Sequence, residues 1–389
     1  MHIGFDISQT GSGKAGCGFF SHALIQDVLQ IAPEKEYSLY PSFGDFYFDA
    51  MMPIRNPYPG RAVHYGPRHL SRDTASAFWN SPGLEEALGN PDIIQSNNFW
   101  CPVQLKKSRL VYTFHDMGFA VDPAWSTEAN RVGCFEGVFR SATSADWVIA
   151  VSSASRDHYL RTFPNFPPER IRVIYQCSRF ADADAPGKRP KALDSVTPME
   201  YWLSVGTIEP RKNQRRLAQA YARYLGMGGK PMPLVLAGGK GWLMEDFQQH
   251  LQELGITAQV IMTGYVTDEE LIWLYRNCYG NLYPSLFEGF GLPVLEGMQF
   301  GAPTLVSDNS SLPEVAGKAA ILLDAHDTEA WAAAMLQLSK DRPLRDSLGD
   351  AARDRAAKFD WKESARQLLA LYAEALSLPK RRDTAALAA

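Results

Sequence analysis

The chain has 389 residues, of which 46% are hydrophobic, and this is enough to bury two hydrophobic cores. Its formal net charge of −4 argues against a general nucleic-acid binder, which would usually be basic. The sequence has no run of about twenty apolar residues and its five cysteines form no Cys-x-x-Cys pair, so we expect a cytoplasmic protein with reduced thiols.

The chain opens with an apolar strand at 2–7, which is unlike a signal peptide, followed by a glycine-rich loop at 8–18 and a helix at 19–30. The loop is not a Walker-type phosphate loop, because Lys14 is followed by Ala15 rather than by Ser or Thr. Its glycines permit a close approach to a ligand, or they simply form a flexible surface loop.

Two further strands of the N-terminal half end in polar residues. The strand at 91–95 is followed by amides and aromatic rings that include Asn98 and Trp100, which suit a sugar acceptor but are equally typical of a folded loop. The next apolar run ends in His115 and Asp116. A histidine at such a place is more often structural than catalytic in an arbitrary protein.

Residues 181–200 are poor in large apolar side chains and rich in proline and charge, which is typical of a linker. We therefore expect an N-terminal domain at 1–180 and a C-terminal domain at 201–358. Asp182 and Asp184 match an Asp-x-Asp metal motif, but they lie in the linker, so we interpret the match as chance and predict no metal site.

Short apolar runs alternate with helical stretches through the C-terminal half, which favours an α/β fold with a parallel sheet. Three of these strands run directly into glycine, at Gly206, Gly238 and Gly264. In an open α/β sheet, ligands bind at such strand ends. After the first of them come Arg211 and Lys212, and adjacent cations at this point suit phosphate oxygens.

The most informative segment places Glu288 and Glu296 eight positions apart across the start of a helix. A strand at 279–285 precedes it, and Pro293 is a first-turn proline whose missing N–H suits a helix start. Backbone N–H groups at such a start favour an anion, for example a diphosphate, with the two carboxylates holding hydroxyl groups on either side. The spacing alone is equally compatible with two surface glutamates on an ordinary strand–turn–helix.

Taken together, these blocks closely resemble glycosyltransferase family 4, retaining enzymes of the GT-B fold, and in particular its mannosyltransferase-like branch. The Glu-x7-Glu pair and the blocks at 206–213, 237–242 and 264–271 carry the resemblance. It implies an α/β protein with two Rossmann-like, doubly wound domains that face each other across a cleft. The N-terminal domain would bind the acceptor and the C-terminal domain the nucleotide sugar. A helix at 359–376 would pack back on the N-terminal domain, ahead of a flexible tail at 377–389.

The resemblance also implies roles for single residues. Arg211 and Lys212 would neutralise the departing nucleotide without a metal or cofactor. Glu288 would bind hydroxyls of the donor sugar, Glu296 would hold the ribose hydroxyls, and His115 would orient the donor sugar. The other donor-binding residues implied are Gly16, Gly18, Gly206, Gly239, Tyr265, Val266, Gly289, Phe290, Gly291 and Leu292. Weaker candidates for acceptor binding are Asn98, Trp100 and Asp116, the last of which would alternatively fix the tautomer of His115.

The chain departs from the family pattern at two positions. Phe19 replaces the arginine of the usual first loop, which puts a side-chain contact from that position in doubt. Thr207 follows Gly206 where the family commonly has an arginine, and we expect Arg211 to compensate.

These roles predict a retaining hexosyltransferase of polysaccharide biosynthesis that forms an α-glycosidic bond to a glycan or lipid-linked glycan. GDP-mannose is the leading donor, because family members with the block at 206–213 and a His-Asp pair resemble mannosyltransferases of polysaccharide assembly. UDP-glucose and UDP-N-acetylglucosamine remain alternatives, because backbone groups usually recognise the base and the sequence then says little about its identity. A lipid-linked acceptor would bring the enzyme to the inner face of the membrane, where the cations Lys106, Lys107 and Arg109 could make peripheral contact. A solvated turn explains these three cations equally well.

Other functional classes remain open. A GT-B sugar-nucleotide epimerase would need extra acid–base groups that the sequence does not reveal. A non-catalytic nucleotide-sugar or glycan-binding protein could lose the charged residues that are present here. A glycoside phosphorylase would need a pyridoxal-phosphate lysine, and nothing marks one. A dinucleotide oxidoreductase is suggested only by the spacing of Gly11, Gly13 and Gly16, and it gives the C-terminal blocks no role.

Overall fold

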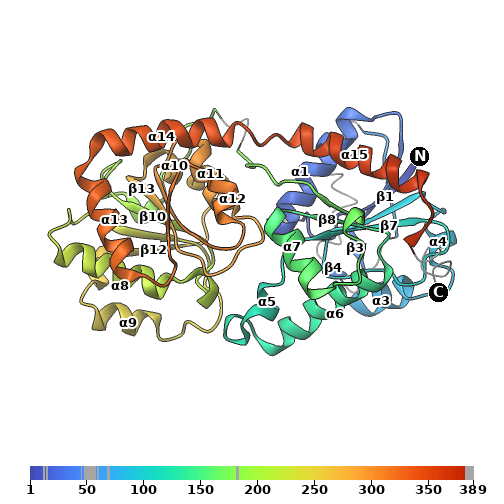
Figure 1. The fold of residues 1–389 in the computed structure, drawn as a ribbon, viewed down its shortest axis with the longest axis horizontal. Helices are drawn as coiled ribbons and strands as arrows, with labels where there is room; N and C mark the ends of the chain where they lie inside the picture. Colours follow the sequence, from blue (N-terminus) through green and yellow to red (C-terminus); the bar gives the residue numbers. More distant parts are fainter. Residues whose placement is uncertain are drawn as a thin grey trace. The chain divides into compact units, whose positions relative to one another are not determined.

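The computed structural model describes residues 1–11, 14, 16–44, 46–47, 58, 61–67, 71–180 and 184–381. The chain divides into two compact units. Unit 1 comprises Met1–Ala120, Glu128–Gln176 and Asp360–Ala389, and unit 2 comprises Val121–Thr127 and Cys177–Phe359. Each unit is built on a parallel sheet with helices packed around it (Figure 1).

The sheet of unit 1 has seven parallel strands in the order β5-β2-β1-β6-β7-β8-β9. They are β1 (His2–Asp6), β2 (Glu36–Tyr40), β5 (His64–Tyr65), β6 (Ile93–Ser96), β7 (Arg109–Phe114), β8 (Trp147–Ala150) and β9 (Ile171–Val173). A short antiparallel pair, β3 (Ser42–Phe43) and β4 (Phe46–Tyr47), forms separately. The strand order reverses between β1 and β6, and doubly wound sheets bind ligands at the carboxyl ends of such strands.

Helices surround this sheet in unit 1 (Figure 1). They are α1 (Gly16–Ile31), α3 (Arg72–Trp79), α4 (Leu84–Ala87), α5 (Gly118–Val121), α6 (Glu128–Ser144), α7 (Ser153–Thr162) and α15 (Trp361–Ser377), with a 3-10 turn η2 (Pro168–Arg170). In α1 the buried residues Phe20, Leu24 and Val28 recur every fourth position. α15 packs along α1, and its Tyr372 hydroxyl donates to Gln95 Oε1 at 3.1 Å.

The sheet of unit 2 has six parallel strands in the order β12-β11-β10-β13-β14-β15. They are β10 (Trp202–Val205), β11 (Leu234–Ala237), β12 (Val260–Gly264), β13 (Gly280–Tyr283), β14 (Thr304–Ser307) and β15 (Ile321–Leu323). Here the order reverses between β10 and β13. The strand ends that the sequence marked with Arg211 and Glu288 are therefore neighbours at the predicted ligand-binding edge.

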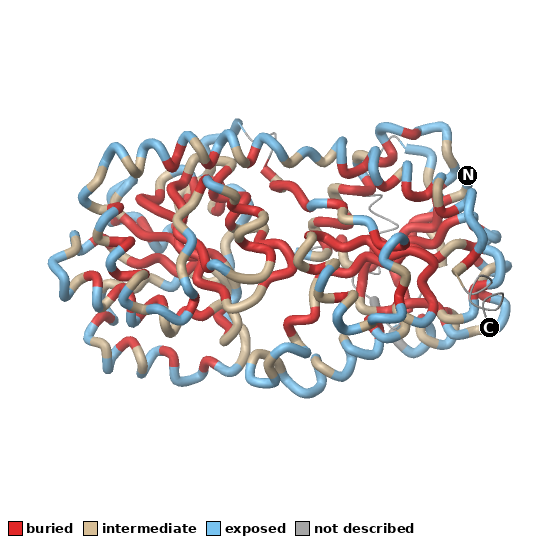
Figure 2. Tube along the Cα trace, viewed as in Figure 1, coloured by how far each residue is buried: buried red, intermediate tan, exposed pale blue. Residues whose placement is uncertain are grey.

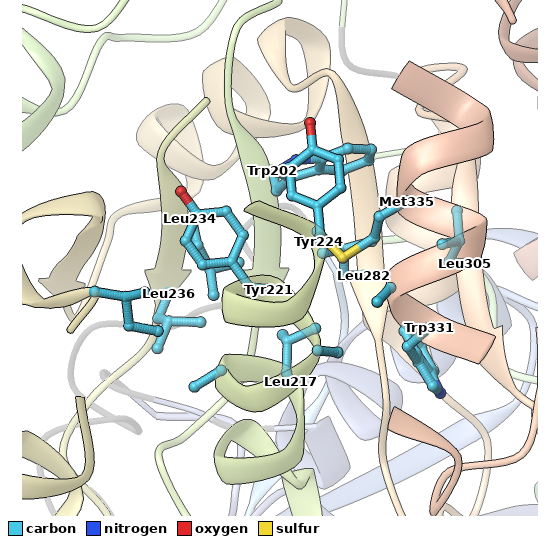
Figure 3. Close-up of a cluster of buried hydrophobic side chains, with 14 of the residues drawn as sticks. Trp202, Leu217, Tyr221, Tyr224, Leu234, Leu236, Leu282, Leu305, Trp331 and Met335 are labelled. Carbon is cyan, nitrogen blue, oxygen red and sulfur yellow. The ribbon is translucent and has the colours of Figure 1, made fainter. Parts of the chain in front are cut away.

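The helices of unit 2 enclose an apolar core around this sheet. They are α8 (Gln214–Gly226), α9 (Phe247–Glu253), α10 (Asp268–Asn277), α11 (Leu292–Gln299), α12 (Leu312–Ala316), α13 (Thr328–Lys340) and α14 (Arg342–Ala356), with 3-10 turns η1 (Pro123–Trp125), η3 (Lys191–Leu193), η4 (Pro210–Lys212) and η5 (Thr257–Gln259). Figure 3 shows part of this core, where Trp202, Tyr224 and Met335 bring together β10, α8 and α13.

Burial follows the pattern that a parallel sheet requires. The central strands β7, β8, β10 and β11 are buried along most of their length, whereas the helices alternate buried and exposed positions (Figure 2). Parallel strands read as nearly continuous apolar runs because helices cover both of their faces. The predicted α/β class with two Rossmann-like, doubly wound domains is confirmed.

The expected linker at 181–200 is not a free connection over its described part. Residues 184–200 belong to unit 2, where Leu193 and Val196 are buried in its core. The backbone is also tied down, because Lys188 N–H donates to the Glu269 carbonyl at 2.9 Å. Two apolar side chains and a few backbone hydrogen bonds are enough to fix a segment whose composition is typical of a linker.

The tail expected from 377 is packed as far as Arg381. Lys380 is buried, and its Nζ donates to the carbonyls of Leu105 and Ser108 at 3.1 and 2.6 Å. The Arg381 N–H donates to Asp146 Oδ1 at 2.9 Å. The reason is polar: two basic residues find buried carbonyl and carboxylate partners in unit 1. Residues 382–389 lie outside the described part of the chain.

Candidate active site

The loops that leave β10 and β13 form the candidate site in unit 2. They are joined directly, because the Leu286 N–H donates to the Arg211 carbonyl at 2.8 Å and Asn213 Nδ2 donates to the Pro284 carbonyl at 3.0 Å. Asn213 adopts a left-handed backbone with φ 61°, which asparagine tolerates better than most residues. The loop after β10 is thereby held against the loop that carries Glu288.

Glu288 lies at the centre of a buried polar cluster and is 8% exposed. Its Oε1 accepts hydrogen bonds from Lys212 Nζ at 2.5 Å, Ser285 Oγ at 2.7 Å and the Tyr283 hydroxyl at 2.9 Å. Its Oε2 accepts from Arg211 Nη1 at 3.0 Å. A carboxylate oxygen usually accepts about two hydrogen bonds, so Oε1 with three donors is crowded, whereas Oε2 has one donor. A sugar hydroxyl that contacts Glu288 would therefore have to share Oε2 with Arg211 or replace a donor on Oε1.

Charges within this cluster compensate one another. Burial alone would raise the pKa of Glu288, but the neighbouring Arg211 and Lys212 outweigh it and bring that pKa to about 2. Arg211 also donates to Oε1 of the buried Glu209 at 2.8 Å, and burial raises the pKa of Glu209. Burial and the adjacent Arg211 lower the pKa of Lys212. Glu288 is therefore ionised at neutral pH and fixes both cations beside the strand ends.

Two serines after β14 pin the turn that precedes α11. The Glu288 N–H donates to Ser310 Oγ at 2.9 Å. Ser311 Oγ donates to the carbonyls of Glu288 and Phe290 at 3.0 and 2.8 Å. The backbone at this helix start is thus held by side chains that the sequence motif does not include.

Gly291 in the same turn is required by the local geometry. Gly291 has φ 106°, and a Cβ at this position would approach Leu312 to 2.7 Å. Gly289 and Phe290 are buried beside it, and Leu292 is the first residue of α11. The anion predicted at this helix start, and the donor contacts predicted for these residues, stay predictions.

Glu296 lies inside α11 in a different cluster and is 2% exposed. Its Oε1 is 2.9 Å from Arg179 Nε, and its Oε2 accepts from the Tyr275 hydroxyl at 3.2 Å. Burial raises the pKa of Glu296, and Arg179 opposes that effect. Arg179 also contacts Asp268 Oδ1 through Nη1 at 3.1 Å. The two carboxylates of the motif therefore have separate sets of partners.

The remaining predicted donor-binding residues of unit 2 follow the ends of β10, β11 and β12. A Cβ at Gly238 would meet the Gly206 carbonyl oxygen at 2.1 Å, so these two loop backbones touch, whereas Gly239 has open space at that position. Tyr265 is 74% exposed, and Val266 packs against the core of unit 2. Donor binding by Gly206, Gly239, Tyr265 and Val266 stays a prediction.

His115 follows β7 in unit 1 and is buried. Its Nε2 lies 3.3 Å from the Asn97 carbonyl oxygen, which can only accept, so we assign the proton to Nε2. Burial lowers the pKa of His115 to about 4, against smaller opposing effects of Asn97 and Asp116. The ring is therefore neutral at pH 7. Asn97 fixes its tautomer in place of Asp116, whose Oδ1 accepts from the Gly118 N–H at 2.8 Å.

Asn97 is itself held by a buried network at the ends of β1, β6 and β7. Its N–H donates to Asp6 Oδ2 at 2.9 Å, and its Oδ1 accepts from Thr113 Oγ1 at 2.7 Å and from Gln95 Nε2 at 3.1 Å. Burial raises the pKa of Asp6 to about 6. This network gives His115 a rigid support.

The proposed acceptor residues Asn98 and Trp100 lie inside unit 1. Asn98 Nδ2 donates to Ser8 Oγ at 2.9 Å, and its Oδ1 accepts from the Trp100 N–H at 2.7 Å. Trp100 packs at 5.4 Å from Phe43 in the core. This placement gives both residues a structural role, and acceptor binding by them has no support from the structure.

The two glycines predicted to approach the donor lie in the first turn of α1. Gly16 begins the helix and has open space where a side chain would be. At Gly18 a Cβ would meet the Gln9 carbonyl oxygen at 2.0 Å. Gly18 is therefore needed by the packing of loop on helix, and its donor-binding role stays a prediction.

The basic cluster at 106–109 is also tied into unit 1. Glu85 accepts hydrogen bonds from the N–H groups of Lys106 and Lys107 at 2.7 and 2.8 Å. Arg109 Nε and Nη2 donate to the carbonyls of Ala375 and Leu378 at 3.0 and 2.9 Å. Arg109 therefore anchors the end of α15.

Sequence reasoning missed five residues that hold the predicted carboxylates and cations, namely Arg179, Glu209, Tyr275, Tyr283 and Ser285. Glu209 was visible inside the block at 206–213, and Tyr283 and Ser285 lie in the strand predicted at 279–285. Arg179 was not visible, because it lies more than a hundred positions from Glu296 and belongs to no periodic pattern. Across the described ranges, no helix is long and apolar enough to cross a membrane, and no three His, Cys, Asp or Glu side chains are grouped to hold a metal.

Comparison with known proteins identifies the family. The family model described as Glycosyl transferases group 1 matches residues 188–355, and that of Glycosyltransferase Family 4 matches residues 40–177. The chain is 35% identical over 285 residues to O-antigen chain mannosyltransferase B of Escherichia coli, covering 72% of this chain and 74% of that protein. The chain belongs to glycosyltransferase family 4. It is a hexosyltransferase, as the sequence predicted.

Further relatives agree with this assignment. The chain is 31% identical over 407 residues to the serotype-specific mannosyltransferase WbdA of Escherichia coli, covering 94% of this chain but only 47%, about half, of WbdA. Sucrose-phosphate synthase from Thermosynechococcus elongatus superposes with a TM-score of 0.71 at 20% identity, and the match covers 97% of this chain and 99% of that one. Anabaena HepE in complex with UDP-glucose gives 0.69 at 19% identity with the same coverage. These neighbours confirm the predicted GT-B fold.

Proposed function

We propose that this family 4 enzyme is a retaining mannosyltransferase that moves mannose from GDP-mannose to a glycan or lipid-linked glycan in O-antigen or related polysaccharide synthesis. Two relatives named as mannosyltransferases support the choice of sugar. The observation that carries the proposal is the cluster at the ends of β10 and β13, where Glu288 fixes Arg211 and Lys212. Two fixed cations at this edge of the sheet suit the diphosphate of a nucleotide sugar.

The two cations would stabilise the negative charge that develops on the leaving group. Transfer breaks the bond between the anomeric carbon and an oxygen of the β-phosphate, so negative charge builds on the departing nucleoside diphosphate. Arg211 and Lys212 would stabilise that charge from fixed positions, which costs no rearrangement during the reaction. Glu288 serves this step by holding the two cations side by side against their mutual repulsion.

Glu288 is poorly suited to act as a nucleophile. Although it is ionised, two hydroxyl groups and two cationic groups already donate to its oxygens. We therefore propose direct transfer with retention, in which the acceptor hydroxyl attacks the face that the phosphate leaves. A new bond forms from the acceptor oxygen to the anomeric carbon, and the released phosphate oxygen takes the hydroxyl proton.

The other roles in the proposal rest on the family resemblance. Glu296 would hold the ribose hydroxyls, and the neutral His115 would contact the donor sugar. The reaction would need neither a metal nor a cofactor. A lipid-linked acceptor would bring the reaction to the cytoplasmic face of the inner membrane.

Nucleotide binding is the first test. We expect calorimetry and thermal unfolding to show binding of GDP in preference to UDP, ADP and NAD, since a ligand that binds the folded state raises its melting temperature. Binding of UDP alone would replace GDP-mannose by UDP-glucose or UDP-N-acetylglucosamine. Binding of NAD alone would refute the site assignment.

Transfer itself is tested with GDP-mannose and an oligosaccharide acceptor. We expect an α-linked product by the one-bond carbon–proton coupling at the new anomeric carbon, formed equally well with EDTA. Loss of activity in EDTA that Mn²⁺ restores would refute metal independence. Conversion of GDP-mannose to another sugar nucleotide without an acceptor would identify an epimerase instead, and binding without any turnover would identify a binding protein.

A further inference from the structure

The carboxylate of Glu296 is fully desolvated but has only two polar partners among the described residues. Arg179 Nε lies 2.9 Å from one oxygen, and the Tyr275 hydroxyl donates to the other at 3.2 Å. Glu296 is 2% exposed, so few of its remaining acceptor positions reach water in the absence of a ligand. A buried carboxylate in this state is costly unless a cation and further donors complete its shell.

The number of acceptor positions indicates what completes that shell. A carboxylate accepts about four hydrogen bonds, two at each oxygen. The Tyr275 hydroxyl uses one position on Oε2, and the Arg179 guanidinium lies against Oε1 as an ion pair, which leaves about one more position on each oxygen. Two hydroxyl groups on adjacent carbons match this pattern, and the ribose of a nucleotide carries such a pair. Glu288 cannot offer one position on each oxygen, because Oε1 already has three donors and Oε2 has one.

Arg179 is the cation that makes this arrangement possible. Burial raises the pKa of Glu296, and Arg179 opposes the shift, with Tyr275 donating to the charged form and Asp268 raising the pKa further. The guanidinium is restrained on its other side by Asp268 Oδ1 at 3.1 Å, and its centre lies 4.9 Å from the ring of Phe180. These contacts fix Arg179 in one orientation.

We propose that Arg179 is a positioning residue for the donor nucleotide: it fixes the carboxylate of Glu296 so that the two remaining acceptor positions bind the ribose diol. This inference rests on the proposed function, because it needs a nucleotide donor. It adds a residue outside the family motifs to the nucleotide site, and it assigns Asp268 to hold Arg179 in place.

The test measures the contribution of the diol, which a purely structural ion pair would not affect. In the wild type we expect GDP to bind about 10- to 100-fold more tightly than 2′-deoxy-GDP, the range for a hydrogen bond to a charged group. In Arg179→Met the ratio of the two dissociation constants should fall to near one. Arg179→Lys, which retains a cation but not the planar fork, should recover part of it.

A matched control separates this effect from general loss of charge. Arg223→Met removes the exposed ion pair between Arg223 on α8 and Glu329 on α13 and should leave the ratio of dissociation constants unchanged. If Arg179→Met does not fold, Asp268→Asn keeps Arg179 but releases its restraint, and it should lower the ratio by about two- to fivefold.

The outcomes separate this inference from the proposed function. If Arg179→Met, or Asp268→Asn used in its place, keeps the wild-type ratio of the two dissociation constants, the role of Arg179 is overturned. The proposal of nucleotide binding would be unaffected. A wild-type enzyme that binds GDP and 2′-deoxy-GDP equally would also overturn the role of Arg179. If UDP is the preferred nucleotide, UDP and 2′-deoxy-UDP replace the guanosine pair. Failure of the wild type to bind any nucleoside diphosphate would refute both proposals.

Discussion

Glu288 and Glu296 stand eight positions apart on one turn and helix, yet their surroundings are opposite. Glu288 receives four donors, two of them cations, and its pKa is lowered to about 2. Glu296 receives one cation and one hydroxyl, and burial raises its pKa. The comparison teaches that a shared motif does not imply a shared role. The carboxylate with four donors organises cations, whereas the one with two partners keeps an acceptor position on each oxygen for a ligand.

The largest effect is expected from Glu288→Ala. Removing the carboxylate frees Arg211 and Lys212 to repel each other, so the charge on the leaving group loses its fixed partners. We expect kcat to fall by about a thousandfold or more, while the dissociation constant of GDP changes only a few-fold. Single-turnover kinetics and calorimetry measure the two quantities. An equally large loss of GDP binding would contradict the division of roles between the two carboxylates.

Glu296→Ala should show the reverse pattern. The ribose hydroxyls lose a charged acceptor, and we expect GDP to bind about 10- to 100-fold more weakly. Because the cations beside the phosphate remain fixed by Glu288, kcat at saturating donor should fall much less. The measurement is KM against kcat for GDP-mannose. A variant in which kcat alone falls would show that Glu296 acts in the chemical step instead.

A smaller effect is expected from Glu209→Gln, which keeps the shape of the side chain but removes one charged partner of Arg211. Glu288 still binds that guanidinium, so Arg211 stays at the site but its orientation is less tightly fixed. We expect kcat/KM to fall by about tenfold, with little change in melting temperature. Glu329→Gln offers a matched control, since it makes the same change in an exposed ion pair with Arg223. A wild-type rate in Glu209→Gln would remove Glu209 from the site.

The position of the cation cluster could be predicted from the sequence, because locating residues at the ends of strands needs only local sequence information. Arg211 follows β10, Glu288 follows β13, and a parallel sheet brings neighbouring strand ends together. The Arg179 contact was beyond such reasoning, because it joins a residue at the start of unit 2 to one on α11. Nothing in the local pattern around 179 distinguishes a buried guanidinium from a solvated one.

Amino-acid composition was a poor guide in two segments whose packing depends on only a few side chains. The stretch at 181–200 has the makeup of a linker, yet Leu193 and Val196 anchor its described part in a core. The tail from 377 was expected to be flexible, yet Lys380 reaches buried carbonyls. The histidine was placed correctly at a strand end, but its tautomer depends on the Asn97 carbonyl, which only the folded sheet brings near.

The smallest effect, and the sharpest test of the comparison, is the pH dependence of stability in Glu288→Gln and Glu296→Gln. The folded pKa of Glu288 is about 2, below its ordinary value of 4.5, so its contribution to stability is present above pH 4.5 and is lost as pH falls toward 2. The folded pKa of Glu296 is raised, so its contribution is present below pH 4.5 and is lost as pH rises through the folded pKa.

The stability of the wild type relative to Glu288→Gln should therefore increase with pH between 3 and 4.5, whereas its stability relative to Glu296→Gln should decrease with pH above 4.5. Each slope is at most about 1.4 kcal/mol per pH unit, and urea unfolding midpoints at a series of pH values measure it. Slopes of the same sign would mean that the two carboxylates share one electrostatic environment, and the separate roles assigned to them would fail.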